Sequence, residues 1–99
     1  MTHEDFNIFL EEIQQDQRDT LGQKSEQYSS DNDKLRNIRI GWPEPGVPHI
    51  LHQLGKHLGA IQLTANGESP YTPERFRENC RDARNWIVIL EAWMKERNT

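Results

Sequence analysis

The chain has 99 residues and a mass of 11.7 kDa, which suits a single domain, residues 1–99, and is too short for two. Its 33% apolar and 28% charged residues predict a narrow core, and its net charge of −4 argues against double-stranded nucleic acid as a partner. The single cysteine, Cys80, excludes an internal disulfide and a multi-cysteine zinc site.

The first predicted helix begins after Thr2, whose side chain can cap the free backbone N–H groups. Its apolar residues recur at helical spacing: Phe6, Phe9, Leu10 and Ile13. We expect this helix over about residues 4–27, with Gly22 as the point at which it can break. A polar turn at 29–33 then precedes a short helix that ends near Asn37.

A Pro/Gly-rich loop is predicted at 41–48, because its three prolines and two glycines are incompatible with a helix. Pro48 suits a first helical turn, so the next helix is predicted over 49–63, and Asn66-Gly67 ends it. Thr72-Pro73-Glu74 begins the last helix, which reaches about residue 97.

The last helix carries apolar residues in alternating steps of four and three, the spacing of a bundle seam. These residues are Phe76, Cys80, Ala83, Ile87, Leu90 and Met94. No segment has a strand pattern. The predicted fold class is therefore all-α, a small bundle of three long helices and a short one.

A polar strip is predicted beside that seam, formed by Glu78, Asp82 and Asn85. Carboxylates four residues apart on a helix can share a divalent cation, so Glu78 and Asp82 are candidate metal ligands. The alternative is structural, with Asp82 paired to a basic residue of a neighbouring helix.

The preceding helix offers two candidate partners for this strip. Lys56 has two open roles, an ion pair with Asp82 or a phosphate contact, and we expect Lys56 and Asp82 to face one another. His57 lies nearer the apolar margin, which favours a hydrogen bond between helices. A zinc site with His49 and His52 has no strong spacing to support it.

Four short motifs occur in the chain: Lys24-x-x-x-Tyr28-Ser29, Asp33-x-Leu35-x-Asn37, Lys56-His57 and Glu78-x-x-x-Asp82-x-x-Asn85-Trp86. Together they resemble small phage proteins of the nucleotide modification associated domain family. That family is similar in turn to all-α nucleoside triphosphate pyrophosphohydrolases, which hold Mg²⁺ between two carboxylate pairs. The resemblance implies a ligand cleft lined by Lys24, Tyr28, Asp33, Asn37, Lys56, His57, Asp82 and Asn85.

The chain departs from the pyrophosphohydrolases in one respect that matters for chemistry. Residues 49–63 contain no Asp or Glu, so the second carboxylate pair is missing there. We therefore assign no catalytic residue and leave hydrolysis open, and we expect Mg²⁺ to bind only together with a phosphate ligand.

Two functions follow as alternatives. The first is a phage-type protein that binds a nucleotide or a nucleotide-derived ligand in the cleft between its helices. The second is a non-enzymatic phage factor that binds and inhibits a host protein. That factor would use an acidic surface and a tryptophan set, Trp42, Trp86 and Trp93, as its interface.

Two further expectations concern location and assembly. No apolar run approaches the roughly 20 residues that span a bilayer, and the first residues do not form a signal peptide, so we expect a cytoplasmic protein without a membrane partner. The last helix carries apolar residues on more faces than one seam covers, which predicts a homo-oligomer.

Overall fold

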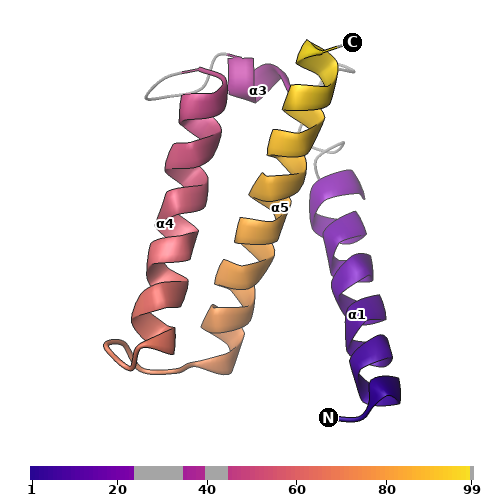
Figure 1. Ribbon diagram of the computed structural model, residues 1–99, viewed down its shortest axis with the longest axis vertical. Coiled ribbons are helices and arrows are strands. Elements are labelled where there is room, and N and C mark those ends of the chain that lie inside the picture. Colours follow the sequence, from indigo (N-terminus) through magenta and orange to yellow (C-terminus); the bar gives the residue numbers. More distant parts are fainter. Residues whose placement is uncertain (24–34, 40–44, 99) are drawn as a thin grey trace. The chain divides into compact units, whose positions relative to one another are not determined.

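The computed structural model describes residues 1–23, 35–39 and 45–98 (Figure 1). All of the secondary structure in these ranges is helical and none is strand, which confirms the all-α prediction. The chain divides into two compact units, Met1–Lys34 and Leu35–Thr99.

The first unit contains helix α1 (His3–Gln17). Its start is the predicted one, because the Asp5 backbone N–H donates to the Thr2 hydroxyl at 3.0 Å and the Thr2 backbone N–H donates to the Asp5 carboxylate at 3.4 Å. This reciprocal pair is a capping box, which satisfies N–H groups that have no partner inside the helix. No residue of α1 is buried, and its apolar stripe stays 41–53% exposed at Phe6, Phe9 and Leu10.

The α-helical geometry of this unit ends earlier than predicted. The expected helix over 4–27 is α-helical only to Gln17 and continues as the π-helical segment η1 (Arg18–Gln23). The Thr20 hydroxyl donates to the Asp16 backbone carbonyl at 2.9 Å, a side-chain bond that competes with the regular ladder. The last part of the prediction, 24–27, lies outside the described residues.

The second unit is built on an antiparallel hairpin of helices α4 (Val47–Ala65) and α5 (Pro73–Arg97), with the short helix α3 (Arg36–Arg39) at its open end (Figure 1). The predicted bounds of α5 are confirmed. Helix α4 starts two residues before the predicted range and ends two after it, with Pro48 in its first turn as expected.

The core of this unit lies at the open end of the hairpin. Ile50 of α4 is fully buried, and Leu35 and Ile38 pack on it from the α3 segment. Four half-buried residues of α5 surround this cluster: Trp86, Ile89, Leu90 and Trp93. The short α3 segment is therefore held by apolar contacts at the end of the hairpin.

The face that α5 turns toward the core differs from the predicted seam. Ile87 and Met94 were expected in the seam but are 48% and 42% exposed, whereas Trp86 and Trp93 pack against the core. Each tryptophan directly precedes one of the exposed residues, so the seam is rotated toward the tryptophan side of the helix. The large rings remove more apolar surface from water than Ile or Met would, which favours this orientation.

Candidate functional site

A polar contact joins the two helices of the hairpin between the core and the closed end. The Nδ1 atom of His57 on α4 lies 3.2 Å from Oδ1 of Asn79 and 3.9 Å from Oδ2 of Asp82, both on α5. Because an amide oxygen can only accept, the His57 ring donates from Nδ1 to Asn79. The His57 side chain is 22% exposed and that of Asp82 is 47% exposed. The predicted hydrogen bond from His57 between the helices is thus confirmed.

The predicted pairing of Lys56 with Asp82 is wrong, because the α4 residue beside Asp82 is His57 and not Lys56. Lys56 is exposed, and no ion pair joins it to Asp82 in the part of the chain that the structure describes. The α4 residues that face α5 follow steps of four and three from Ile50 through Leu54 to His57. Lys56 lies one position earlier, about 100° around the helix, so its side chain is exposed beside this line of residues instead of packing between the helices.

The other predicted ligand and metal residues are distributed as follows. Glu78 is exposed on α5, and Asn85 is half-buried on the same helix. Asn37 belongs to α3, but its side chain is not described. Four predicted residues lie outside the described ranges: Lys24, Tyr28, Asp33 and Trp42. Of the predicted set, the structure brings together His57 and Asp82, and it adds Asn79, which the sequence analysis missed.

The two described tryptophans of the predicted interface contribute to the fold. The Trp86 ring meets His49 edge-on at a centroid distance of 5.7 Å, and the Arg39 guanidinium lies 5.8 Å from the Trp93 ring centroid. Arg39 also pairs with Glu96. Both rings are half-buried against the core, and their role at an interface stays a prediction.

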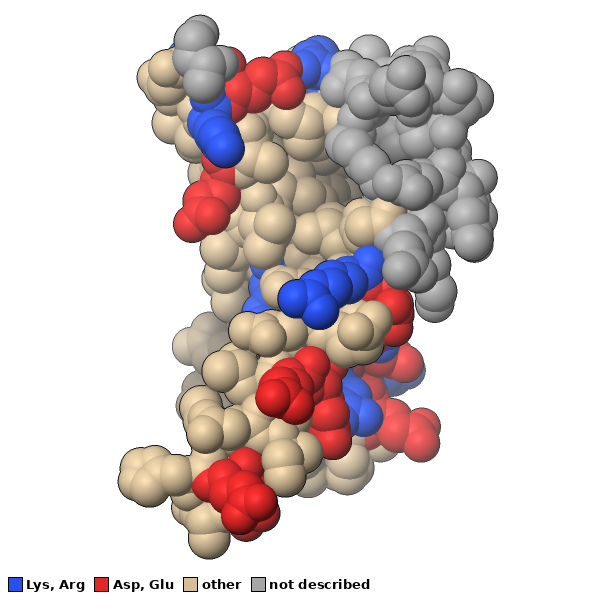
Figure 2. All heavy atoms as spheres, turned by 90° about the vertical axis from the view of Figure 1, so that its right-hand side faces the viewer, with Lys and Arg blue, Asp and Glu red and all other residues tan. Residues whose placement is uncertain are grey.

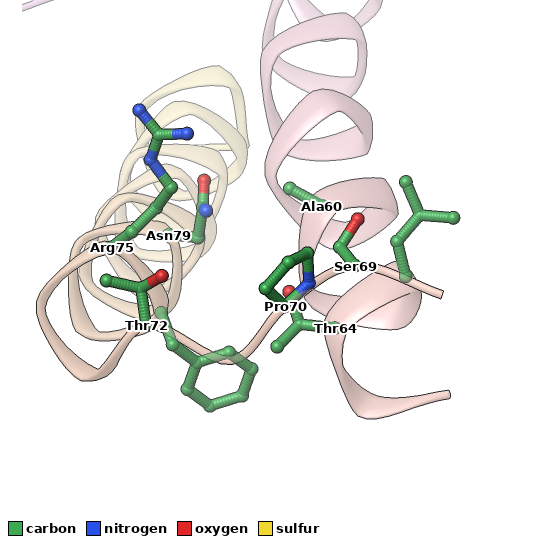
Figure 3. A pocket seen from close by; sticks show the side chains of 9 residues that line it. Ala60, Thr64, Ser69, Pro70, Thr72, Arg75 and Asn79 are labelled. Atoms are coloured by element: carbon green, nitrogen blue, oxygen red, sulfur yellow. The ribbon is translucent and has the colours of Figure 1, made fainter. Parts of the chain in front are cut away.

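A pocket of about 310 Å³ lies at the closed end of the hairpin, beside the connection between α4 and α5 (Figure 3). Arg75 and Asn79 line it from α5, Ala60 and Thr64 from α4, and Ser69 from the connection. Arg75 is the one charged residue in this lining, and hydroxyl groups come from Thr64, Ser69 and Thr72. Asn79 belongs to the pocket and also accepts from His57, so pocket and polar contact are continuous.

Figure 2 shows how charged residues are distributed on one face of the molecule. There, basic and acidic side chains are scattered among uncharged ones. Within residues 1–23, 35–39 and 45–98, no group of three or more His, Cys, Asp or Glu side chains could hold a metal ion. Among the described helices, none combines the length and the apolar character needed to cross a membrane.

Comparison with protein-family models, curated proteins and solved structures gives no match to this chain.

One prediction concerns metal binding at Glu78 and Asp82. We expect Mg²⁺ alone to bind with a Kd of about 1 mM or weaker, because two exposed carboxylates supply too few oxygens for an ion that sheds its water reluctantly. Calorimetric titration of the protein with MgCl₂, with and without a nucleoside triphosphate, measures this. Tight binding to the free protein that disappears in Asp82→Ala would contradict the prediction.

Proposed function

We propose that the protein binds a small phosphate-bearing ligand, a nucleotide or a nucleotide-derived molecule, in the pocket at the closed end of the α4–α5 hairpin. One observation carries the proposal: the lining combines a single guanidinium, that of Arg75, with three hydroxyl groups and the Asn79 amide. This is the donor chemistry that recognises phosphate oxygens, because a guanidinium can form two parallel charge-assisted hydrogen bonds to them.

The local backbone supports the same ligand class. The pocket includes Thr72, the residue that precedes the first turn of α5, and its side chain makes no capping hydrogen bond. The first N–H groups of a helix lack partners within it and favour negative charge. A volume of about 310 Å³ lies at the lower end of ligand pockets, which span roughly 300–1,000 Å³, and suits part of a nucleotide rather than a large ligand.

We propose binding without hydrolysis, because the helices of the hairpin supply too few carboxylates to hold catalytic metal ions. Asp82 lies beside His57, and Glu78 is exposed one turn away, so α5 supplies one acidic pair. The facing residues of α4 supply no acid, so the second set of carboxylates that a two-metal site would need is missing from this helix. The motif resemblance supports a phage origin, in which the protein would act in the host cytoplasm.

The test is calorimetric titration with a panel of nucleoside mono-, di- and triphosphates and with inorganic phosphate. We expect at least one nucleotide to bind, and Arg75→Ala to weaken it about tenfold or more, since a lost charge-assisted contact costs about 1.5–3 kcal/mol. Arg77→Ala is the matched control, because it removes the same charge half a turn away, outside the pocket lining.

Two results would contradict the proposal. One is the absence of binding by every ligand in the panel. The other is an equal loss of affinity in Arg75→Ala and Arg77→Ala, which would show that only net charge matters.

A second candidate function rests on a different observation. Helix α1 presents Phe6, Phe9 and Leu10 at helical spacing with none of them buried, as in amphipathic helices that dock into a groove of a partner. This favours the non-enzymatic inhibitor of a host protein. Replacing Phe6 and Phe9 by serine would abolish partner binding in that case and leave nucleotide binding unchanged.

A further inference from the structure

One side of the α4–α5 hairpin carries exposed apolar side chains on both helices. Leu51 and Leu58 of α4 are 52% and 48% exposed, and Ile87 and Met94 of α5 are 48% and 42% exposed. These four residues are called the apolar side below. Spaced seven residues apart on each helix, they form two parallel rows.

The two rows lie on the same side of the hairpin for a geometric reason. Leu51 and Leu58 directly follow Ile50 and His57, which face α5, and Ile87 and Met94 directly follow Trp86 and Trp93, which face the core. In antiparallel helices, residues one position after the seam fall on the same side of the pair. The opposite side carries polar residues such as Gln53 and Asp82, which directly precede the seam residues Leu54 and Ala83.

A two-helix hairpin cannot bury such a face by itself. The buried hydrophobic residues in the described part of the chain are few: Leu35, Ile38, Ile50, Leu54 and Ala83. A contiguous exposed apolar face on helices usually marks a surface that another chain covers. We propose that the apolar side binds the same side of a second copy, so that two hairpins form a four-helix bundle.

The chemistry of the face favours a second copy over a charged partner. The four apolar residues are uncharged, and the charged residues that lie beside them on α5, Arg84 and Glu91, have opposite signs, so a two-fold axis can bring unlike charges together. The apolar residues are seven positions apart on both helices, so the apolar side chains of one copy can insert between those of the other copy.

The outer edge of α5 supplies complementary charges. Arg84 and Glu91 lie on the flank of the Ile87 row, and neither has an ion-pair partner among the described residues. With α5 and the second copy's α5 antiparallel and the two-fold axis between Ile87 and Val88, Arg84 of each copy lies opposite Glu91 of the other. The pairing fixes the register of the proposed dimer.

Sedimentation velocity of the full chain at micromolar concentration tests the dimer. We expect wild type at twice the 11.7 kDa chain mass, and Leu58→Glu to raise the dimer Kd more than about tenfold because two carboxylates would be buried. Leu63→Glu is the matched control: Leu63 is 46% exposed on the same helix but points away from the apolar side. A monomeric wild type, as would result if another segment or a different protein covers the face, overturns the proposal. Equal effects of the two variants also overturn it.

Exchanging the charges of Arg84 and Glu91 tests the proposed register of the dimer without placing a charge in its apolar interface. Arg84→Glu and Glu91→Arg should each weaken self-association, because each places like charges opposite one another twice. Mixing the two variants should restore association as a heterodimer in which both pairs are complementary. Failure of the mixture to associate more tightly than either variant alone would overturn the proposed pairing. Circular dichroism of each variant confirms that its helices are intact.

Discussion

Ile50→Ala should lower the free energy of unfolding by about 2–5 kcal/mol, the range for removing a large aliphatic side chain from a packed core. Ile50 is 0% exposed and contacts both the α3 segment and the tryptophan side of α5. Its loss therefore opens a cavity at the point where three elements meet. Leu35 and Ile38 of the α3 segment pack in the same cluster as Ile50, so this segment should detach before the hairpin opens.

Urea denaturation followed by circular dichroism measures this effect at a fixed protein concentration. A chain of this size typically has about 5–15 kcal/mol of stability, so the expected loss is a large part of the total. Leu63→Ala serves as the control, because Leu63 is 46% exposed and its truncation should cost less than about 1 kcal/mol. Equal losses in the two variants would show that Ile50 is not the centre of the core.

Local signals in the sequence were sufficient for the helix ends that depend on local chemistry. Thr2 begins α1 and Pro73 begins α5 as predicted, because caps and first-turn prolines act within a few residues of themselves. The change from α- to π-helical geometry after Gln17 was not predicted, and the Thr20 bond to the Asp16 carbonyl competes with α-helical geometry in that stretch.

The face by which each helix packs against its neighbour was predicted less accurately than the helix ends. Periodicity gives the width of an apolar stripe but not which residue at its margin meets the neighbour. On α5, Trp86 and Trp93 pack against the core while Ile87 and Met94 are exposed. On α4, His57 rather than Lys56 lies beside Asp82. Each outcome depends on the shape of the facing helix, which lies far away in the sequence.

The candidate site was also predicted only in part, because it depends on contacts between residues that are far apart in the sequence. Asp82 and His57 were identified, but the pocket that contains Arg75 and Asn79 depends on how the connection 66–72 closes the hairpin. An arginine in the first turn of a helix is usually a solvated surface residue, so no signal in the sequence distinguishes Arg75 as a pocket residue. Asn79 has one signal that was available: it lies three residues before Asp82, on the same face of the helix.

Gly46→Ala should lower the free energy of unfolding by about 2–4 kcal/mol, from two causes that add. Gly46 has φ 80° and ψ −143°, a conformation that side chains rarely adopt. An added Cβ would lie 3.3 Å from the Trp93 ring, closer than ordinary contact. The residue cannot move away easily, because its N–H donates to the Ile38 carbonyl at 2.8 Å and its own carbonyl accepts from Ile50.

Gly67→Ala is the control without a ring contact. Gly67 has a nearly equal φ of 79°, but no atom lies within 4 Å of an added Cβ, so this variant should show only the cost of a side chain at positive φ, about 1–2 kcal/mol. The larger loss expected in Gly46→Ala combines the Trp93 contact with the ψ of −143°, a conformation that is essentially restricted to glycine. Tryptophan fluorescence should change in Gly46→Ala and not in Gly67→Ala, because only the first displaces the Trp93 ring. Identical unfolding curves and unchanged fluorescence in both variants would mean that the Trp93 contact contributes nothing to the stability of this end of the hairpin.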